Sequence, residues 1–315
     1  MAMHTGNSDH LIRSELWSSQ LKETLKDELQ GTNYVNWLNE FPDGNTFTIP
    51  SIGDALADDY TENDAVKYRA LDAGEFQFSI TEYLSSANYI TNKNKQDGFY
   101  MDQLAASFVP KQNRAIMERV EADVLGLQSQ QTASNGNLIN GAKHRYVATG
   151  TDEVIALKDF ARARHALKVA NVPDQNLVAI VDPSVEYTLN TLSNLTNVSN
   201  NPRWEGIVAD GIATGMSFVK NVYGFDVYVS NNLADANEQI DSAGATTAAG
   251  KANLFFSAAS DVLPFVGAWR QMPQVDSDYN KDLQRDEYVT TARYGVKLYR
   301  PENLVCVLSD NDKVE

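Results

Sequence analysis

The chain has 315 residues, 43% of them hydrophobic, so it can bury the core of one large domain or of two moderate ones. Its net charge of −16, from 26 basic and 42 acidic residues, argues against a nucleic-acid-binding surface spread over the protein, and its single cysteine, Cys306, excludes an intrachain disulfide and any multi-cysteine metal site. No apolar run approaches the roughly 20 residues of a membrane span and the polar N-terminus lacks a signal-peptide core, so we expect a soluble intracellular protein without a membrane partner.

The first predicted element is a helix over residues 11–30, which Gly31 ends. Its apolar stripe consists of Leu16, Trp17, Leu21, Leu25 and Leu29. At the start of the chain this helix packs either on its own domain or across another part of an assembly.

A two-stranded ribbon is predicted next. Residues 46–49 and 76–81 alternate in polarity, which is typical of half-buried strands, and this alternation places Phe76, Phe78 and Ile80 on one face. An isolated two-stranded ribbon is marginally stable in water, so this face needs a surface to lie on. If the chain's own domain supplies that surface, the protein is monomeric; if a neighbouring copy supplies it, the ribbon is an assembly device.

Five carboxylates crowd the interval between the two arms of the ribbon: Asp54, Asp58, Asp59, Glu62 and Asp64. The loop pattern of a calcium site, with its fixed glycine and terminal glutamate, is missing. We therefore expect a solvated loop and no metal.

The central element is an amphipathic helix over residues 110–128, preceded by a short helix near residues 99–108. Ile116, Val120, Val124 and Leu127 recur at spacings of four, four and three, and Pro110 suits the first turn. A second helix, over residues 152–170, follows a polar glycine-rich link. Its basic residues are Lys158, Arg162, Arg164, His165 and Lys168, which either pair with the chain's own carboxylates or contact a polyanion.

The remaining chain is predicted to alternate strands with one helix. A buried strand at residues 176–181 leads through Asp182, as N-cap, and Pro183 into a helix ending near residue 192. Gly224 permits a bend before a strand at 225–229. Further strands are predicted near residues 253–257, 265–272, 287–298 and 304–308, with a polar hairpin loop at residues 273–286.

The order of these elements resembles that of a major capsid protein of tailed bacteriophages with the Hong Kong 97 fold. The resemblance covers nearly the whole chain and is carried by FTIPSIGD, FQFSITEYLSSANYI, VEADVLGL, VAIVDPSVEYTL, NVYGFDVYVSNNL and ARYGVKLYRPENLVCVL. It implies an α+β fold. Its parts would be an N-terminal arm (1–40), an extended β-hairpin loop (41–91), a peripheral domain (92–176) with the spine helix 110–128, an axial domain (177–259) and returning peripheral strands (260–315).

The resemblance also implies a function. The chain would assemble as hexamers and pentamers into an icosahedral procapsid that matures in the virion and encloses double-stranded DNA without reading its sequence. Assembly would take place in the host cytoplasm, with a portal, a decoration protein and a scaffolding protein as partners. Because the arm begins almost at Met1, we expect the scaffold to be a separate protein.

Contacts between neighbouring copies are expected in the ribbon and in the polar hairpin loop. The residues expected in them are Phe76, Phe78, Ile80, Lys67, Arg69, Asp278, Tyr279 and Arg285. Some relatives join a loop lysine to an asparagine of the next subunit. Lys67 is the only lysine of this ribbon and no partner can be matched to it, so we expect no such crosslink.

Enzymatic alternatives find little support. The four histidines stand in unrelated contexts, and neither a G-x-S-x-G nor an H-E-x-x-H spacing occurs. Residues 244–251 fail as a phosphate loop because five residues separate the glycines and Ala252 replaces the hydroxyl residue. We expect no catalytic residues and no cofactor. The alternatives kept open are an encapsulin-like shell around protein cargo, a phage tail-tube protein and a carboxylate-based hydrolase.

Overall fold

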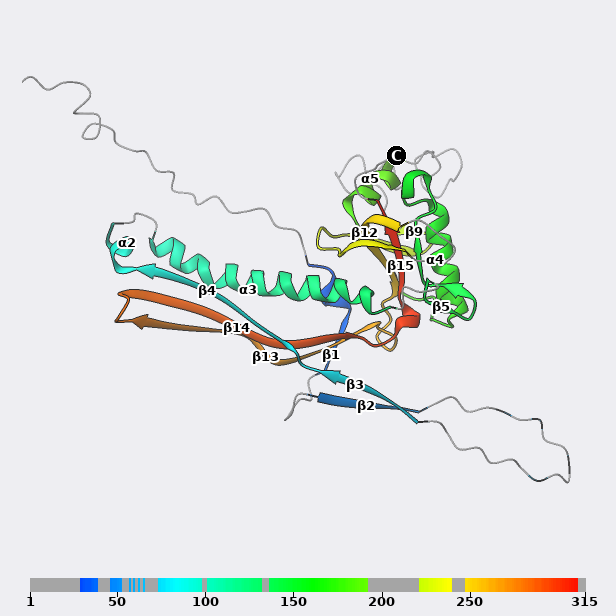
Figure 1. The fold of residues 1–315 in the computed structure, drawn as a ribbon, viewed down its shortest axis with the longest axis horizontal. Coiled ribbons are helices and arrows are strands. Elements are labelled where there is room, and N and C mark those ends of the chain that lie inside the picture. Colours follow the sequence, from blue (N-terminus) through cyan, green and yellow to red (C-terminus); the bar gives the residue numbers. More distant parts are fainter. Residues whose placement is uncertain are drawn as a thin grey trace, which may run out of the picture.

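The computed structural model describes residues 29–38, 46–52, 73–97, 101–131, 136–191, 221–239 and 247–310, together with the single residues 57, 59, 62 and 65. In this part of the chain an elongated half, built on a long helix, adjoins a compact half built on a second sheet (Figure 1). The predicted helix over 11–30 lies outside the described residues except for Leu29 and Gln30, which are not helical. Most of the acidic interval also lies outside them.

The elongated half is a four-stranded sheet with one helix along it (Figure 1). Its strand order is β1 (Val35–Leu38), β13 (Phe265–Asn280), β14 (Arg285–Leu298), β4 (Glu82–Thr91). β1 runs parallel to β13, and the other pairs are antiparallel. The short helix α2 (Asn92–Asp97) follows β4, and α3 (Met101–Gly126) returns along β14 and β4 before a 3₁₀ turn (Leu127–Gln130).

The central helix is confirmed and is longer than predicted. Ile116, Val120, Val124 and Leu127 are all buried, as their spacing indicates. Pro110, however, lies inside α3 and not at its start, so the two helices predicted over residues 99–128 are one. A proline removes one helical hydrogen bond. The helix continues through it because its inner face packs along two strands, and packing of such a face supplies most of a helix's stability.

The prediction of a polar loop at residues 273–286 is wrong. β13 and β14 pair as far as Asn280 and Arg285, which leaves only residues 281–284 for the turn. β4 extends the ladder on the other side of β14, from Glu82 to Thr91. The side chains here are polar because this end of the sheet is largely exposed, whereas the backbone groups are satisfied by the ladder. Side-chain polarity therefore misled the prediction.

The compact half is a seven-stranded sheet. Its order is β7 (Arg145–Val147), β15 (Val305–Ser309), β12 (Thr247–Ser257), β8 (Leu177–Val181), β10 (Phe225–Val229), β9 (Asn221–Val222), and β11 (Asp235–Gln239) pairs with β12. β8 and β15 are buried at every position. β15, which lies in the range expected for the peripheral domain, is thus part of this sheet.

Helices close one face of this sheet. α4 (Leu157–Val169) and α5 (Pro183–Thr191) pack over a core in which the rings of Phe160, Phe225 and Phe255 meet edge to face at centroid distances of 5.0–6.4 Å. The opposite face contributes Leu254 and Phe256 to the core that contains α3, so this core joins the two halves.

Local signals around the compact sheet are confirmed. The backbone N–H of Ser184 donates to Asp182 Oδ2 at 3.0 Å, which is the predicted N-cap of α5. Gly224 has φ +89° at the bend before β10, a backbone conformation that favours glycine. Among the described helices, none combines the length and the apolar character that a membrane crossing needs.

Candidate intersubunit surfaces

The predicted ribbon exists and leaves the body near β14. β2 (Thr46–Ile52) and β3 (Ala73–Ser79) are antiparallel, with Phe47 opposite Phe78. In Figure 1 the pair is a separate ribbon that meets the four-stranded sheet at the end of β3 and extends away from α3. Lys67 and Arg69 lie outside the described residues.

The apolar face of the ribbon is covered by its own chain, which corrects the expectation that a neighbour covers it. Phe78 is 1% and Ile80 is 4% exposed, and both pack with Val266 and Ala268 of β13. The close approach depends on Gly295 of β14, where an added Cβ would lie 2.8 Å from the carbonyl oxygen of Ser79. A sheet position without a side chain lets β3 lie directly on the sheet.

Phe76 is held by the same chain. Its ring lies edge-on to that of Tyr299 at 4.9 Å, and the Lys297 ammonium lies 4.9 Å from the ring centroid. Lys297 Nζ also donates to the carbonyl oxygen of Gln77 at 2.8 Å. The base of the ribbon is therefore bound to β14 and to Tyr299. Cover by the same chain is the case for which the sequence predicted a monomer, so the ribbon base gives no support for assembly, and only the parts beyond it remain for a neighbour.

Asp278, Tyr279 and Arg285, which were expected in intersubunit contacts, lie near the turn between β13 and β14. We call this part of the molecule the hairpin end. The Tyr279 hydroxyl accepts from the Asn92 amide at 2.8 Å and lies 3.0 Å from Gln284 Oε1. Arg285 binds Glu287 at 2.6 Å and holds its guanidinium 4.5 Å from the Tyr89 ring centroid.

Asp278 accepts a hydrogen bond from the backbone N–H of Tyr279 at 2.8 Å, and Asp278 is exposed at the surface. The Arg285 contact holds the pKa of the Glu287 carboxyl below its ordinary value. The hairpin end is thus an ordered, charged surface.

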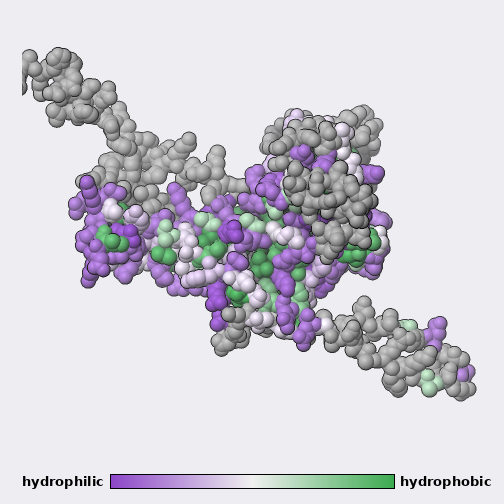
Figure 2. Space-filling view, in the orientation of Figure 1, coloured by the Kyte–Doolittle hydropathy of each residue, from purple (hydrophilic) through white to green (hydrophobic). Residues whose placement is uncertain are grey.

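The ribbon base covers one end of the sheet face that turns away from α3, and along β4 the described residues leave side chains of this face exposed. On β4, Leu84 packs against the α3 core, so the alternate residues point outward. Of these, Tyr83 is 66% and Tyr89 is 58% exposed. Figure 2 shows hydrophobic residues in patches among hydrophilic ones along this half of the molecule. Sequence reasoning missed this face, although an even separation between two tyrosines of a predicted strand was a usable signal.

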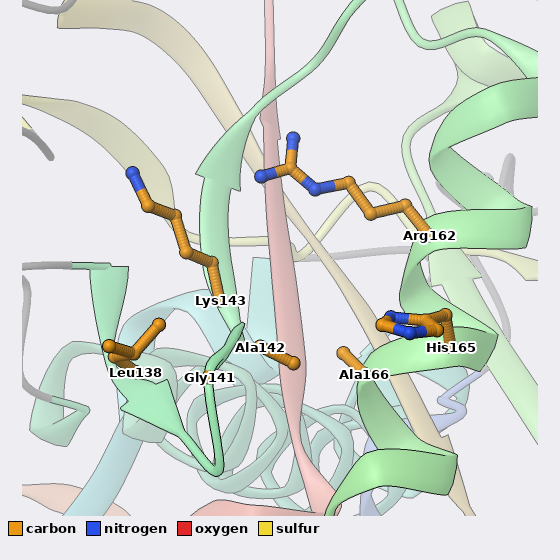
Figure 3. A pocket seen from close by; sticks show the side chains of 7 residues that line it. All are labelled: Leu138, Gly141, Ala142, Lys143, Arg162, His165 and Ala166. Atoms are coloured by element: carbon orange, nitrogen blue, oxygen red, sulfur yellow. The ribbon is translucent and has the colours of Figure 1, made fainter.

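A recess opens between α4 and the hairpin of β5 (Leu138–Ile139) and β6 (Ala142–Lys143), with a volume of about 310 Å³. Its lining consists of Leu138, Gly141, Ala142, Lys143, Arg162, His165 and Ala166. In Figure 3 the side chains of Arg162 and His165 extend from α4, and that of Lys143 starts on β6 and points away from them. We call it the cationic recess.

The basic residues of α4 divide into two groups. Arg164 and Lys168 bind Asp174 at 2.6 and 3.1 Å and hold the pKa of its carboxyl below the ordinary value. This confirms pairing with the chain's own carboxylates for these two. Arg162 instead places its guanidinium carbon 4.0 Å from the Tyr146 ring centroid, above the cationic recess.

Two buried ionisable groups, Glu121 and Tyr294, have structural partners. Glu121 accepts the backbone N–H groups of Gln30, Gly31 and Thr32. Tyr294 donates to Asp123, and its burial raises its pKa, so this hydroxyl stays protonated.

No candidate metal or phosphate site emerges from the part of the chain that the structure describes. It contains no group of three His, Cys, Asp or Glu side chains placed to hold a metal ion. Cys306 is buried, as its apolar strand predicted. Lys251, from the rejected phosphate loop, lies on β12 and binds Asp235 at 2.6 Å.

Comparisons with known proteins agree on one kind of molecule. A family model described as "Phage capsid protein" matches residues 79–307. Among curated proteins, none is significantly similar in sequence. Solved structures are similar over nearly their whole length.

One similar structure, described as Mycobacterium phage Che8, is 18% identical with a TM-score of 0.69 and covers 94% of this chain and 97% of its own. The capsid structure of Cyanophage P-SCSP1u is 15% identical with a TM-score of 0.71 and covers 97% and 95%. The capsid of Ralstonia phage GP4 is 10% identical with a TM-score of 0.66 and covers 100% of both chains. At these identities the likeness concerns the fold.

Proposed function

Since this chain belongs to the phage capsid protein family, we propose that it is the major capsid protein that assembles as hexamers and pentamers into an icosahedral head around double-stranded DNA. Membership of the family gives the chain a role in the capsid shell of a virion and supports a structural role. The finer statements on assembly and contents are the proposal.

The observation that carries the proposal is the exposed part of the sheet face along β4. One face of β4 and β14 packs on α3, whereas Tyr83 and Tyr89 on the other face are more than half exposed. Aromatic side chains are enriched at protein interfaces, and an exposed face of a rigid sheet needs little ordering when it binds. A neighbouring copy is the natural cover for this face in a shell.

Two further surfaces would complete the contacts. The hairpin end offers Asp278, Tyr279 and Arg285, held in place by contacts within their own chain. The ribbon beyond its fastened base, including Lys67 and Arg69, would reach a neighbouring subunit. In this arrangement the elongated half forms the peripheral part of the shell, and the compact half, in which β7, α4 and β15 join residues 177–259, surrounds the capsomer centre, with residues 1–40 as the arm.

The proposal includes the other components of a head. A separate scaffolding protein, a portal and a decoration protein would act with the shell, which would assemble in the host cytoplasm. The net charge of −16 supports an inner wall that does not adsorb the packaged duplex, because each neutralised phosphate would add salt-dependent affinity and hinder release.

Negative-stain microscopy of the expressed chain, with and without its scaffold, tests the proposal. We expect closed shells of uniform size whose class averages show six-fold and five-fold capsomers. Single subunits or open rings under both conditions would overturn it. Shells that copurify with one protein cargo and never contain DNA, even with portal and packaging motor present, would favour the encapsulin-like alternative.

A further inference from the structure

The cationic recess is unusual on this protein because it gathers positive charge on an acidic chain. The chain has 16 more acidic than basic residues, yet none of the described residues that line the recess carries a carboxylate. Arg162 and His165 come from α4 and Lys143 from β6, so three residues with a positive or protonatable group belong to the lining, although the Lys143 ammonium points away from the other two (Figure 3).

Arg162 is held in place while its hydrogen-bonding edge stays available. Its guanidinium lies over the Tyr146 ring at 4.0 Å, and Tyr146 is in turn held by a hydrogen bond from its hydroxyl to the carbonyl oxygen of Asp159 at 2.9 Å. A ring contact uses the face of the guanidinium and leaves the N–H groups at its edge. Among the described residues, none accepts a hydrogen bond from these N–H groups.

The chemistry of the recess fits one oxyanion. A guanidinium edge binds a carboxylate or phosphate through two parallel hydrogen bonds, and His165, three residues further along α4 in the same lining, can donate another. Small residues at Gly141, Ala142 and Ala166 leave the volume in which such a group would sit.

A carboxylate suits the recess better than a phosphate of duplex DNA. Binding to a duplex needs several phosphate contacts in a row, whereas the neighbouring cations of α4, Arg164 and Lys168, are already bound to Asp174. A carboxylate is the group that every copy of this acidic chain carries in surplus. Because like-charged copies repel one another, a local attraction of opposite charge would also fix how they meet.

We propose that the cationic recess receives a carboxylate side chain from a second copy of the chain, bound to the Arg162 edge and His165. The inference deepens the proposed function and rests on it, since it assigns one contact of the shell. The occupant is thus a glutamate or aspartate of a neighbouring subunit.

The test compares Arg162→Gln with Lys158→Gln. Both substitutions remove one positive charge from α4, but Lys158 is exposed and does not line the recess. The critical concentration for shell assembly of the full chain is measured by light scattering, and affinity for a short DNA duplex by fluorescence anisotropy. We expect Arg162→Gln to raise the critical concentration by about tenfold and Lys158→Gln to change it by less than about twofold, with duplex affinity equal in both.

His165→Gln serves as the second variant, because an exposed side chain on the recess can be replaced without disturbing the Tyr146 contact. It should raise the critical concentration in the same direction as Arg162→Gln while the thermal midpoint of the subunit stays unchanged. If Arg162→Gln lowers the stability of the subunit, the critical concentration measured for His165→Gln decides whether the inference holds.

The outcomes separate the two proposals. If the unaltered chain forms shells and the recess variants assemble at the same concentration as Lys158→Gln, the inference fails and the proposed function stands. If the recess variants lose affinity for the duplex and assemble normally, the occupant is a phosphate and the inference is overturned. If the unaltered chain forms no shells under any condition, the proposed function fails and the inference fails with it.

Discussion

The carboxylate of Glu121, in α3, accepts a hydrogen bond from the backbone N–H of Gly31 at 2.8 Å. The same carboxylate accepts the N–H groups of Gln30 and Thr32 at 3.0 Å each. A Cβ on Gly31 would lie 2.9 Å from Leu125 Cδ2, so only a glycine fits this close approach without displacing Leu125. The chain that precedes β1 is therefore tied to α3 at a defined point.

Glu121→Gln is expected to destabilise the subunit by about 1–3 kcal/mol, because an amide offers one acceptor oxygen and turns its NH₂ group toward buried donors. Urea unfolding of the purified subunit below its assembly concentration measures the change. Glu118→Gln is the control: its carboxylate pairs with Arg114 on a half-exposed face of the same helix, and its loss should cost no more than about 0.5 kcal/mol. Equal effects would contradict a structural role for the Glu121 contacts.

Phe78→Asp tests the corrected position of the ribbon base. Because Phe78 is 1% exposed in its own chain, the charge should destabilise the folded subunit by about 3 kcal/mol or more, and not merely prevent assembly. Gln77→Asp, on the exposed side of the same strand, should change stability by no more than about 0.5 kcal/mol. Circular dichroism and urea unfolding give both values. A stable Phe78→Asp subunit that forms no shells would support the original expectation that a neighbouring copy covers Phe78.

Ile116→Asp should unfold the subunit, since Ile116 is 3% exposed where α3 meets the core, and burying an unpaired carboxylate there costs about 4 kcal/mol or more. The neighbouring residue Ala115 is exposed, so Ala115→Asp should leave the subunit folded. Soluble yield and the far-UV spectrum distinguish the two variants. A folded Ile116→Asp subunit would show that the helix does not depend on its buried face.

Tyr83→Ser tests the exposed part of the sheet face along β4. The side chain is 66% exposed, so its removal should leave the urea midpoint unchanged while raising the critical concentration for assembly by about tenfold. Tyr187→Ser, which removes a 54% exposed tyrosine from α5, should have less than about a twofold effect on assembly. Light scattering against subunit concentration measures both. Identical curves for Tyr83→Ser and the unaltered chain would remove this face from the contacts.

His144 should make the subunit sensitive to acid. Burial lowers the pKa of His144 from the ordinary 6.5. As the pH falls, His144 therefore takes up a proton more readily in the unfolded chain than in the folded chain. Stability from this residue is complete above pH 6.5 and is lost as the pH falls below it. Urea midpoints should therefore fall between about pH 7.5 and about pH 5.5, and fall less in His144→Gln. The urea midpoints above pH 7.5 serve as the baseline. Equal losses in the unaltered chain and in His144→Gln would contradict the prediction.

Several elements were predictable because their signal is local. The spacing of Ile116, Val120 and Val124 needs only the helical period, and the cap at Asp182 needs only the residues beside it. The cationic recess was not predictable in the same way. The recess depends on where α4 meets the β5–β6 hairpin, which no short stretch of sequence records.

By itself the sequence determined the central helix, the buried strand at residues 177–181, the two arms of the ribbon and the resemblance to capsid proteins. Only the tertiary structure decided which faces are covered and by what. Phe78 is buried by Val266, and Thr290 donates to Gln112 across 178 positions of the chain. The alternation of side chains along a strand shows that one face is apolar. Which segment buries that face is decided by contacts between parts of the chain that are far apart in the sequence.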